Sequence, residues 1–122
     1  MNSVVHFEIP FINKKRAVKF YSALFGWKMQ DLGESGYVLV YAAKKDKKVS
    51  IGINGGLYKR SNRAKTPFLV IGVASVEAML KKIAKAGGKV VTPRQPIPMG
   101  SYARFRDPEG NVLAIADDKK ME

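Results

Sequence analysis

The sequence predicts an α+β domain in which two similar βαβββ modules form a curved mixed sheet around a pocket. Three observations support this fold class. Short β-rich runs flank two segments with helical spacing of apolar residues, each helical segment ends at glycine, and the first half of the pattern recurs in the second. At 122 residues, the chain is expected to be a single domain, residues 1–122, with no room for a second one.

The first module is predicted over residues 4–54. It opens with a strand over Val4–Ile9, which Pro10 is expected to end. Asn13 is a good helix N-cap, and apolar residues at helical spacing continue until Gly26 terminates the helix. Three β-rich runs bounded by Gly, Asp or Lys complete the module; they are Trp27–Leu32, Gly36–Ala42 and Val49–Ile53.

The second module is predicted over residues 68–117, after a linker over residues 55–67 that is rich in Gly and basic residues. A strand over Phe68–Val73 precedes the N-cap Ser75 and a helix that Gly87 and Gly88 close. Three strands follow, over Lys89–Thr92, Ser101–Arg106 and Val112–Ala116, the last two joined by a turn over Asp107–Asn111.

The two modules align with one offset. Ser75 minus Asn13 gives 62, and Gly88 minus Gly26 gives 62 as well. Such a repeat of a supersecondary unit predicts that the two halves share one topology.

Strand alternation assigns side chains to two faces of the sheet. The face expected to pack on the helices carries Val5, Phe7, Ile9, Leu69, Ile71, Val73, Ala103, Phe105, Leu113 and Ile115. The opposite face is expected to line the pocket, and it carries His6, Glu8, Phe68, Val70, Tyr102 and Arg104. Polar groups that face a common hollow need partners, and a ligand can be one of them.

Composition narrows the functional classes. The chain has no cysteine, which excludes disulfides, thiolate metal sites and a cysteine nucleophile. No apolar run approaches the roughly 20 residues of a membrane span, and the N-terminus lacks the pattern of a secretion signal. We therefore expect a cytoplasmic protein with no membrane partner.

The net charge of +12, from 22 Lys and Arg against 10 Asp and Glu, raises nucleic acid as a partner. The basic residues are scattered over turns and outer helix faces, and no aromatic side chains are interleaved with them. A solvated basic surface is the favoured interpretation, and a nucleic-acid-associated protein is kept as an alternative.

Two segments resemble a known family. The run VHFEIPFINKKRAVKFYSALFGW is similar to the opening of glyoxalase/bleomycin-resistance/dioxygenase proteins of the vicinal-oxygen-chelate superfamily, and FRDPEGNVLAI is similar to their closing strand pair. The resemblance extends from Val4 to Asp117. It implies the glyoxalase/bleomycin-resistance-like fold, a small-molecule ligand and a homodimer, but it does not select an activity, since that fold hosts isomerases, lyases, dioxygenases and metal-free binding proteins.

The resemblance also implies where metal ligands would lie, at equivalent positions in the first and last strands of each module. With the offset of 62, these positions are His6, Gly52, Phe68 and Ala114. Only His6 has a donor, and Glu8 on the same strand would add at most a second, whereas such ions want three or more protein ligands. No catalytic metal and no cofactor are therefore expected.

His6 is the only histidine of the chain. It is either a general base or hydrogen-bond donor in the pocket, or a residue satisfied by a neighbour such as Glu8 or Tyr102. Arg104 either anchors a ligand carboxylate or phosphate or pairs with Glu8, unless a β-bulge turns it outward.

Several aromatic and thioether side chains could form a wall for a flat ligand, although Trp27 is better explained as core. These are Trp27, Tyr37, Tyr41, Met99 and Tyr102. Met99 is expected in a stiff Pro-rich loop, PRQPIPMGSY, and Gly55-Gly56 is interpreted as a turn because it lacks the rest of a phosphate-binding motif.

These observations favour a protein that binds a small organic ligand in a concave pocket without a catalytic metal. The expected ligand contacts are His6, Glu8, Tyr102, Arg104, Met99 and Phe68, with His6 also the candidate catalytic residue. The alternative is a metal-dependent lyase, isomerase or dioxygenase of the same superfamily.

Overall fold

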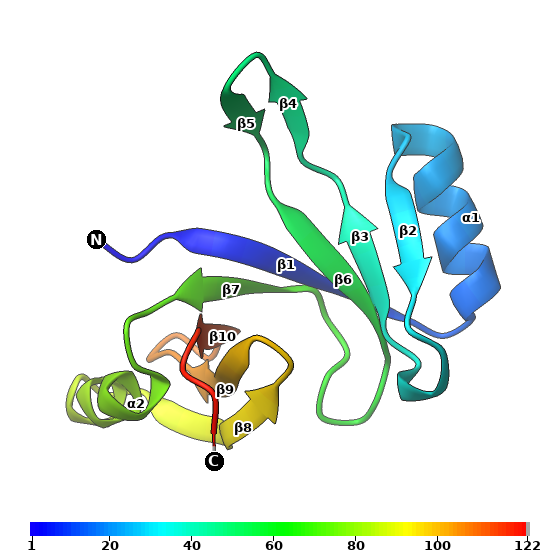
Figure 1. The fold of residues 1–122 in the computed structure, drawn as a ribbon. Coiled ribbons are helices and arrows are strands. Elements are labelled where there is room, and N and C mark those ends of the chain that lie inside the picture. Colours follow the sequence, from blue (N-terminus) through cyan, green and yellow to red (C-terminus); the bar gives the residue numbers. More distant parts are fainter. Residues whose placement is uncertain (122) are drawn as a thin grey trace. The chain divides into compact units, whose positions relative to one another are not determined.

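The computed structural model describes residues 1–121, which form two compact units. One unit is His6–Pro67, and the other combines residues 1–5 with the chain from Phe68 onward. Each unit holds strands and one principal helix in the order βαβββ (Figure 1). The predicted α+β class with a repeated module is therefore confirmed.

The first module contains β1 (Val4–Phe11), α1 (Lys14–Phe25), β2 (Lys28–Asp31), β3 (Val38–Tyr41) and β6 (Asn54–Lys59). The strands are ordered β2-β3-β6-β1, with β1 and β6 parallel and the other neighbours antiparallel. A 3-10 turn, η1 (Gly33–Ser35), precedes β3. A separate hairpin of β4 (Lys44–Asp46) and β5 (Val49–Ile51) is inserted between β3 and β6, and it projects beyond them in Figure 1.

Three details of the first module differ from the sequence prediction. The third module strand is β6 and not Val49–Ile53, which contributes to the inserted hairpin instead. The segment expected to begin the linker, residues 55–59, is therefore part of β6. Pro10 lies inside β1 opposite Tyr58, because a strand tolerates proline where its missing N–H is not needed.

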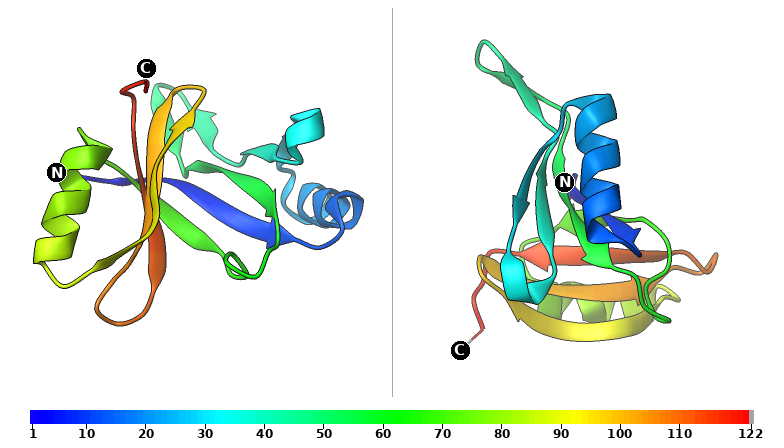
Figure 2. Two further views of the ribbon diagram at one scale, coloured as in Figure 1. Left: turned by 90° about the horizontal axis from the view of Figure 1, so that it is seen from below. Right: turned by 90° about the vertical axis from the view of Figure 1, so that its right-hand side faces the viewer.

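The second module contains β7 (Phe68–Gly72), α2 (Val76–Lys85), β8 (Lys89–Ile97), β9 (Gly100–Arg106) and β10 (Val112–Asp117). Its order is β7-β10-β9-β8, with β7 and β10 parallel, so the topology of the first module is repeated. The right-hand view of Figure 2 shows α2 along one face of β8, β9 and β10.

The expected Pro-rich loop is instead the end of β8 and its turn into β9. The pairing of β8 with β9 shifts register between Val90 and Thr92 and again between Thr92 and Gln95. Since β8 is the outer strand of its module, these irregularities accommodate Pro93 and Pro96 without breaking the pairing.

Both helices begin at the predicted caps. Asn13 Oδ1 accepts a hydrogen bond from Arg16 N at 3.0 Å, and Ser75 Oγ accepts one from Ala78 N at 3.2 Å. Gly26 ends α1 in the left-handed conformation, with φ 69°. No helix within residues 1–121 is long and apolar enough to cross a membrane.

Each helix covers its own hydrophobic cluster. In the first module the buried centre is Phe11, Val38, Val40 and Leu57, and in the second it is Val76, Ala103 and Ile115. The predicted helix-facing residues Phe7, Ile9, Ile71, Val73 and Phe105 pack against these centres. The alternation that placed His6, Glu8, Tyr102 and Arg104 on the other face is consistent with this packing.

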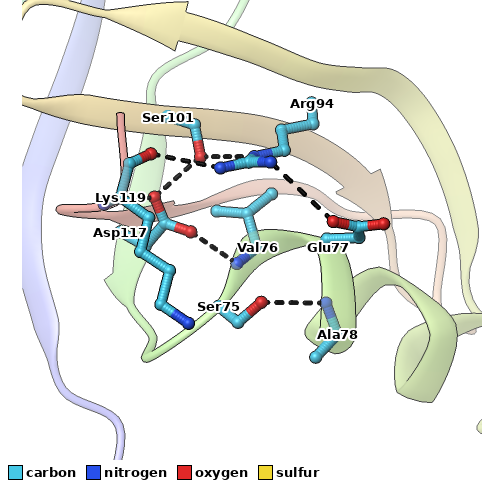
Figure 3. Close-up of polar contacts among 8 residues, drawn as sticks. All are labelled: Ser75, Val76, Glu77, Ala78, Arg94, Ser101, Asp117 and Lys119. Atoms are coloured by element: carbon cyan, nitrogen blue, oxygen red, sulfur yellow. Dashed lines mark hydrogen bonds and ion pairs between the residues drawn. The ribbon is translucent and has the colours of Figure 1, made fainter. Parts of the chain in front are cut away.

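A buried polar network joins α2 to three strands of its module (Figure 3). Asp117 Oδ2 accepts a hydrogen bond from Val76 N at 2.8 Å, and Asp117 Oδ1 accepts one from Ser101 Oγ at 2.7 Å. Arg94 Nε donates to Ser101 Oγ at 2.9 Å. The carboxylate thereby satisfies one of the free N–H groups at the start of α2.

Candidate functional site

Three side chains of the first unit form a hydrogen-bonded cluster around one carboxylate oxygen. The Tyr37 hydroxyl donates to Glu8 Oε1 at 2.5 Å. His6 Nε2 lies 2.8 Å from the same Glu8 oxygen and 3.0 Å from the Tyr37 hydroxyl. We call His6, Glu8 and Tyr37 the triad cluster.

Strand pairing brings the triad cluster together. Val38 and Val40 are buried in the core, so Tyr37 and Leu39 point to the opposite face of the sheet. Leu39 pairs with Gly56, and Gly56 pairs with Glu8, so β6 lies between the other two strands. The phenol of Tyr37 must therefore cross β6 to reach Glu8.

Two adjacent glycines allow that crossing. A Cβ on Gly56 would lie 1.6 Å from the Tyr37 hydroxyl oxygen, and a Cβ on Gly55 would lie 2.4 Å from the Phe7 ring. The Gly55-Gly56 pair is thus not the turn expected from sequence but the middle of β6, where one aromatic ring covers each face. A side chain at Gly56 would occupy the position of the phenol.

The environment keeps Tyr37 protonated. Burial raises the pKa of the Tyr37 phenol above its ordinary value, and the charge of Glu8 and the hydrogen bond to it raise this pKa further. Tyr37 is therefore a permanent donor to Glu8. The His6 side chain remains 28% exposed, so part of its ring is accessible from solvent.

The second unit holds the other predicted contacts. The guanidinium carbon of Arg104 lies 4.9 Å from the centre of the Phe68 ring, in cation–π geometry. Tyr102 lies two residues before Arg104 on β9, on the same side of the strand. Ala103 between them is in the core, and β9 pairs regularly with β10, so no bulge turns Arg104 away from this face. Met99 lies in the exposed turn between β8 and β9.

The donor set does not fit a bound divalent metal. In the first module Glu8 lies opposite Gly56, and in the second module its equivalent, Val70, lies opposite Ala114. The residue of the first module that corresponds to Ala114 is therefore Gly56, with an offset of 114 − 56 = 58. The expected counterpart, Gly52, lies between β5 and β6 and outside both strands. His6 therefore remains the sole donor at the four positions, and within residues 1–121 no three His, Cys, Asp or Glu side chains gather as a metal site.

The predicted aromatic wall is divided between different environments. Trp27 stacks on Tyr21 at 5.3 Å and packs with the core, as the sequence favoured. Tyr41 donates to Gln30 Oε1 at 2.7 Å on the exposed end of its strand. Tyr37, predicted only as part of the aromatic wall, is instead the partner of Glu8. The sequence signal for it is the two-residue spacing from Leu39, which places both on the face opposite the buried Val38 and Val40.

Comparisons with known proteins give one family and one fold. The model of the Glyoxalase/Bleomycin resistance protein/Dioxygenase superfamily matches residues 3–115. A solved methylmalonyl-CoA epimerase in complex with methylmalonyl-CoA and NH4+ is 16% identical, with a TM-score of 0.68 and coverage of 97% of this chain and 95% of that chain. Comparison with curated proteins gives no match.

Two further solved structures are similar. A hypothetical protein from Bacillus halodurans C-125 is 16% identical, with a TM-score of 0.66 and coverage of 99% of this chain and 97% of that chain. A superfamily member from Vibrio splendidus 12B01 is 10% identical, with a TM-score of 0.63 and coverage of 97% of this chain and 99% of that chain. At these identities the likeness concerns the fold.

Proposed function

This chain belongs to the glyoxalase/bleomycin resistance protein/dioxygenase superfamily, and we propose that it binds a small organic ligand at the triad cluster without a catalytic metal. The observation that carries the proposal is the convergence of His6 and Tyr37 on one oxygen of Glu8, on the sheet face opposite the hydrophobic core. Tyr37, whose phenol has a raised pKa, and the partly exposed His6 make this cluster a candidate binding site.

The triad cluster is suited to a ligand that exchanges hydrogen bonds or a proton. Tyr37 holds Glu8, Glu8 orients the His6 ring through Nε2, and the exposed part of His6 is left for the ligand. His6 is then the contact residue, while Glu8 and Tyr37 position it. Phe68, Tyr102, Arg104 and Met99 stay proposed ligand contacts of the second unit.

The metal-dependent lyase, isomerase or dioxygenase is the weaker alternative. It would require at least one further donor beside His6 and Glu8, and the register places glycine, alanine and phenylalanine at the other expected positions. Homodimer formation and a cytoplasmic location also stay predictions.

A thermal-shift screen of metabolites and metal salts, with and without chelator, tests the proposal. A ligand at 100 times its dissociation constant should add about 2.7 kcal/mol to the free energy of unfolding and raise Tm by several degrees. His6→Ala and Tyr37→Phe should each remove most of that shift. Tyr41→Phe is the matched control, since it deletes an exposed hydroxyl at the far end of β3, the strand that Tyr37 precedes, and it should leave the shift unchanged.

Two results would contradict this function. A hit whose shift survives both His6→Ala and Tyr37→Phe does not bind at the triad cluster. A hit that requires a metal salt and disappears with chelator would establish the metal-dependent alternative instead.

The inserted β4–β5 hairpin supports nucleic acid as a second candidate partner. Its residues 44–51 include four lysines, and every residue of both strands is exposed. Lys47 occupies the tip with φ 59°, a left-handed conformation that glycine or asparagine adopts at lower cost. A projecting two-stranded ribbon can enter the major groove of DNA.

A hairpin variant with its four lysines changed to glutamine should then bind DNA more weakly, and its affinity should depend less on salt concentration. The four are Lys44, Lys45, Lys47 and Lys48. Each lost phosphate contact lowers the slope of log K against log salt by about 0.9. The control variant changes four lysines that are exposed on the helices to glutamine, so it has the same net charge as the hairpin variant. These are Lys19, Lys81, Lys82 and Lys85. Equal losses in both variants, or no retention of the parent protein on DNA at low salt, would eliminate this candidate.

A further inference from the structure

A pocket lies where β1 leads into α1, and none of its lining residues belongs to the triad cluster. It has a volume of about 360 Å³, within the range of small-molecule sites. Its walls come from the end of β1, the first turns of α1 and the segment that follows β6. The lining residues are Pro10, Phe11, Ile12, Asn13, Arg16, Ala17, Phe20, Tyr21, Arg60 and Lys65. We call it the β1–α1 pocket.

The charged lining of the β1–α1 pocket is entirely positive. Arg16, Arg60 and Lys65 face it, and the described residues that line it include no acidic side chain. Lys14 pairs with Asp31 and Arg94 with Glu77, and neither of these cations lines the pocket. Three like charges around one hollow repel one another unless an anion lies between them.

The remainder of the lining is apolar and partly uncovered. Ile12 is 72% exposed and Phe20 is 53% exposed, beside the rings of Phe11 and Tyr21. Exposed apolar side chains next to a cluster of cations suit a molecule with one charged end and one apolar body.

Backbone hydrogen bonds hold the cationic rim in place. Arg60 N donates to Phe11 O at 2.9 Å, which ties the segment after β6 to the end of β1. Ser61 and Ala64 exchange two backbone hydrogen bonds, of 3.1 and 3.2 Å. The Tyr58 hydroxyl donates to Thr66 O at 2.8 Å, next to Lys65. A rim ordered before binding loses less entropy when a ligand arrives.

We propose that the β1–α1 pocket binds a small organic anion that joins a phosphate or carboxylate group to a flat apolar body. Arg16, Arg60 and Lys65 take the anionic group, because guanidinium forks match both oxyanions. Phe20 and Ile12 cover the apolar body. This site is separate from the ligand site proposed at the triad cluster.

Four simple probes test the two halves of this chemistry, and Trp27 reports binding. Trp27 is the single tryptophan and stacks on Tyr21, a lining residue. Phenyl phosphate or benzoate should change the fluorescence of Trp27 in a saturable way. The one that binds more tightly shows whether the pocket prefers a phosphate or a carboxylate. Inorganic phosphate should bind at least about tenfold more weakly, and benzyl alcohol, which lacks the charge, should not saturate.

Variants distinguish binding at this pocket from non-specific attraction of anions to a basic protein. The triple change Arg16→Gln, Arg60→Gln and Lys65→Gln should weaken phenyl phosphate binding at least about tenfold, and Phe20→Ala should weaken it as well. The control Lys15→Gln, Lys19→Gln and Lys28→Gln removes the same charge from exposed residues outside the lining and should change affinity less than about twofold. His6→Ala should have no effect.

Three outcomes would overturn the β1–α1 pocket proposal. They are equal losses in the two triple variants, inorganic phosphate binding as tightly as phenyl phosphate, and no saturable binding of phenyl phosphate or benzoate at about 1 mM. Because His6 is not part of this pocket, each of these results leaves the proposed function at the triad cluster untouched, and a failure of that function leaves the pocket untouched.

Discussion

Replacing Asp117 with alanine is expected to lower the free energy of unfolding by about 3 kcal/mol and Tm by roughly 10 °C. Asp117 is only 9% exposed, and its carboxylate accepts hydrogen bonds from Val76 N, Ser101 Oγ and Lys119 N. The alanine variant leaves the buried Val76 N–H at the start of α2 without an acceptor. Chemical denaturation monitored by circular dichroism measures the loss.

Replacing Asp117 with asparagine should lower the free energy of unfolding by less than alanine does, and the loss should depend on pH. Burial alone would raise the pKa of Asp117, but the hydrogen bonds from Val76, Ser101 and Lys119 and the charge of Arg94 together lower it below its usual value. The stabilisation is therefore complete above the unfolded pKa, near 3.8, and disappears as pH falls through the lower folded pKa. The stability gap between the parent protein and Asp117→Asn should be constant above about pH 5 and shrink below about pH 4.

Asp118 provides the control for both Asp117 variants. It is the neighbouring acidic residue but is exposed, so Asp118→Ala should change stability by less than about 0.5 kcal/mol. Equal effects at Asp117 and Asp118, or an Asp117→Asn gap that does not vary with pH, would show that the network in Figure 3 does not hold α2 to its sheet.

Replacing Gly56 with alanine is expected to cost about 2 kcal/mol of stability and to abolish the ligand response attributed to His6. The new Cβ would lie 1.6 Å from the Tyr37 hydroxyl oxygen and 2.1 Å from the ring carbon that carries it. The phenol must move away, so Glu8 loses the Tyr37 hydroxyl, one of its two partners, while remaining buried. Denaturation and the thermal-shift response measure the two effects.

A double-mutant cycle makes the Gly56 prediction specific. In a Tyr37→Ala background the phenol is absent, so Gly56→Ala should cost much less than in the parent protein. The coupling between the two positions should exceed about 1 kcal/mol. If Gly56→Ala costs the same in both backgrounds, the glycine serves the backbone of β6 rather than the phenol.

The features that the sequence predicted are those that depend on residues close together in the chain. The caps at Asn13 and Ser75 and the glycine at Gly26 depend on neighbours a few residues apart, and the structure confirms each of them. Alternation in the first strands is correct for Phe7, Ile9, Ile71 and Val73, which pack on the hydrophobic clusters. It is wrong for Val5 and Leu69, which are 49% and 46% exposed, and for Val70, which is buried. The face assignment of His6 and Glu8 follows from the same alternation. These features predicted the repeated βαβββ order and two of the three residues of the triad cluster.

The largest error concerns the last strand of the first module; two smaller ones are Pro10, which lies inside β1, and the expected Pro-rich loop, most of which belongs to β8. The connection over residues 42–53 is longer than the turn over residues 107–111 that it matches, so the offset falls from 65 before it, between Leu39 and Arg104, to 58 after it, between Gly56 and Ala114. The inserted hairpin took Val49–Ile51, and the β6 segment was assigned to a linker. A repeat offset cannot report such an insertion, because the lengths of connections are not constrained by the strands they join.

The sequence by itself determined the family resemblance, the helices and their caps, and the face on which His6 and Glu8 lie. Tertiary pairing alone decided that Gly56 lies opposite Glu8, that Tyr37 crosses it, and that Asp117 caps α2 from 41 residues away. The physical reason is the separation in sequence between the residues that interact. Caps and alternation are set by adjacent residues, whereas the register of β1, β6 and β3 is set by the packing of Phe11, Val38 and Leu57 in one core.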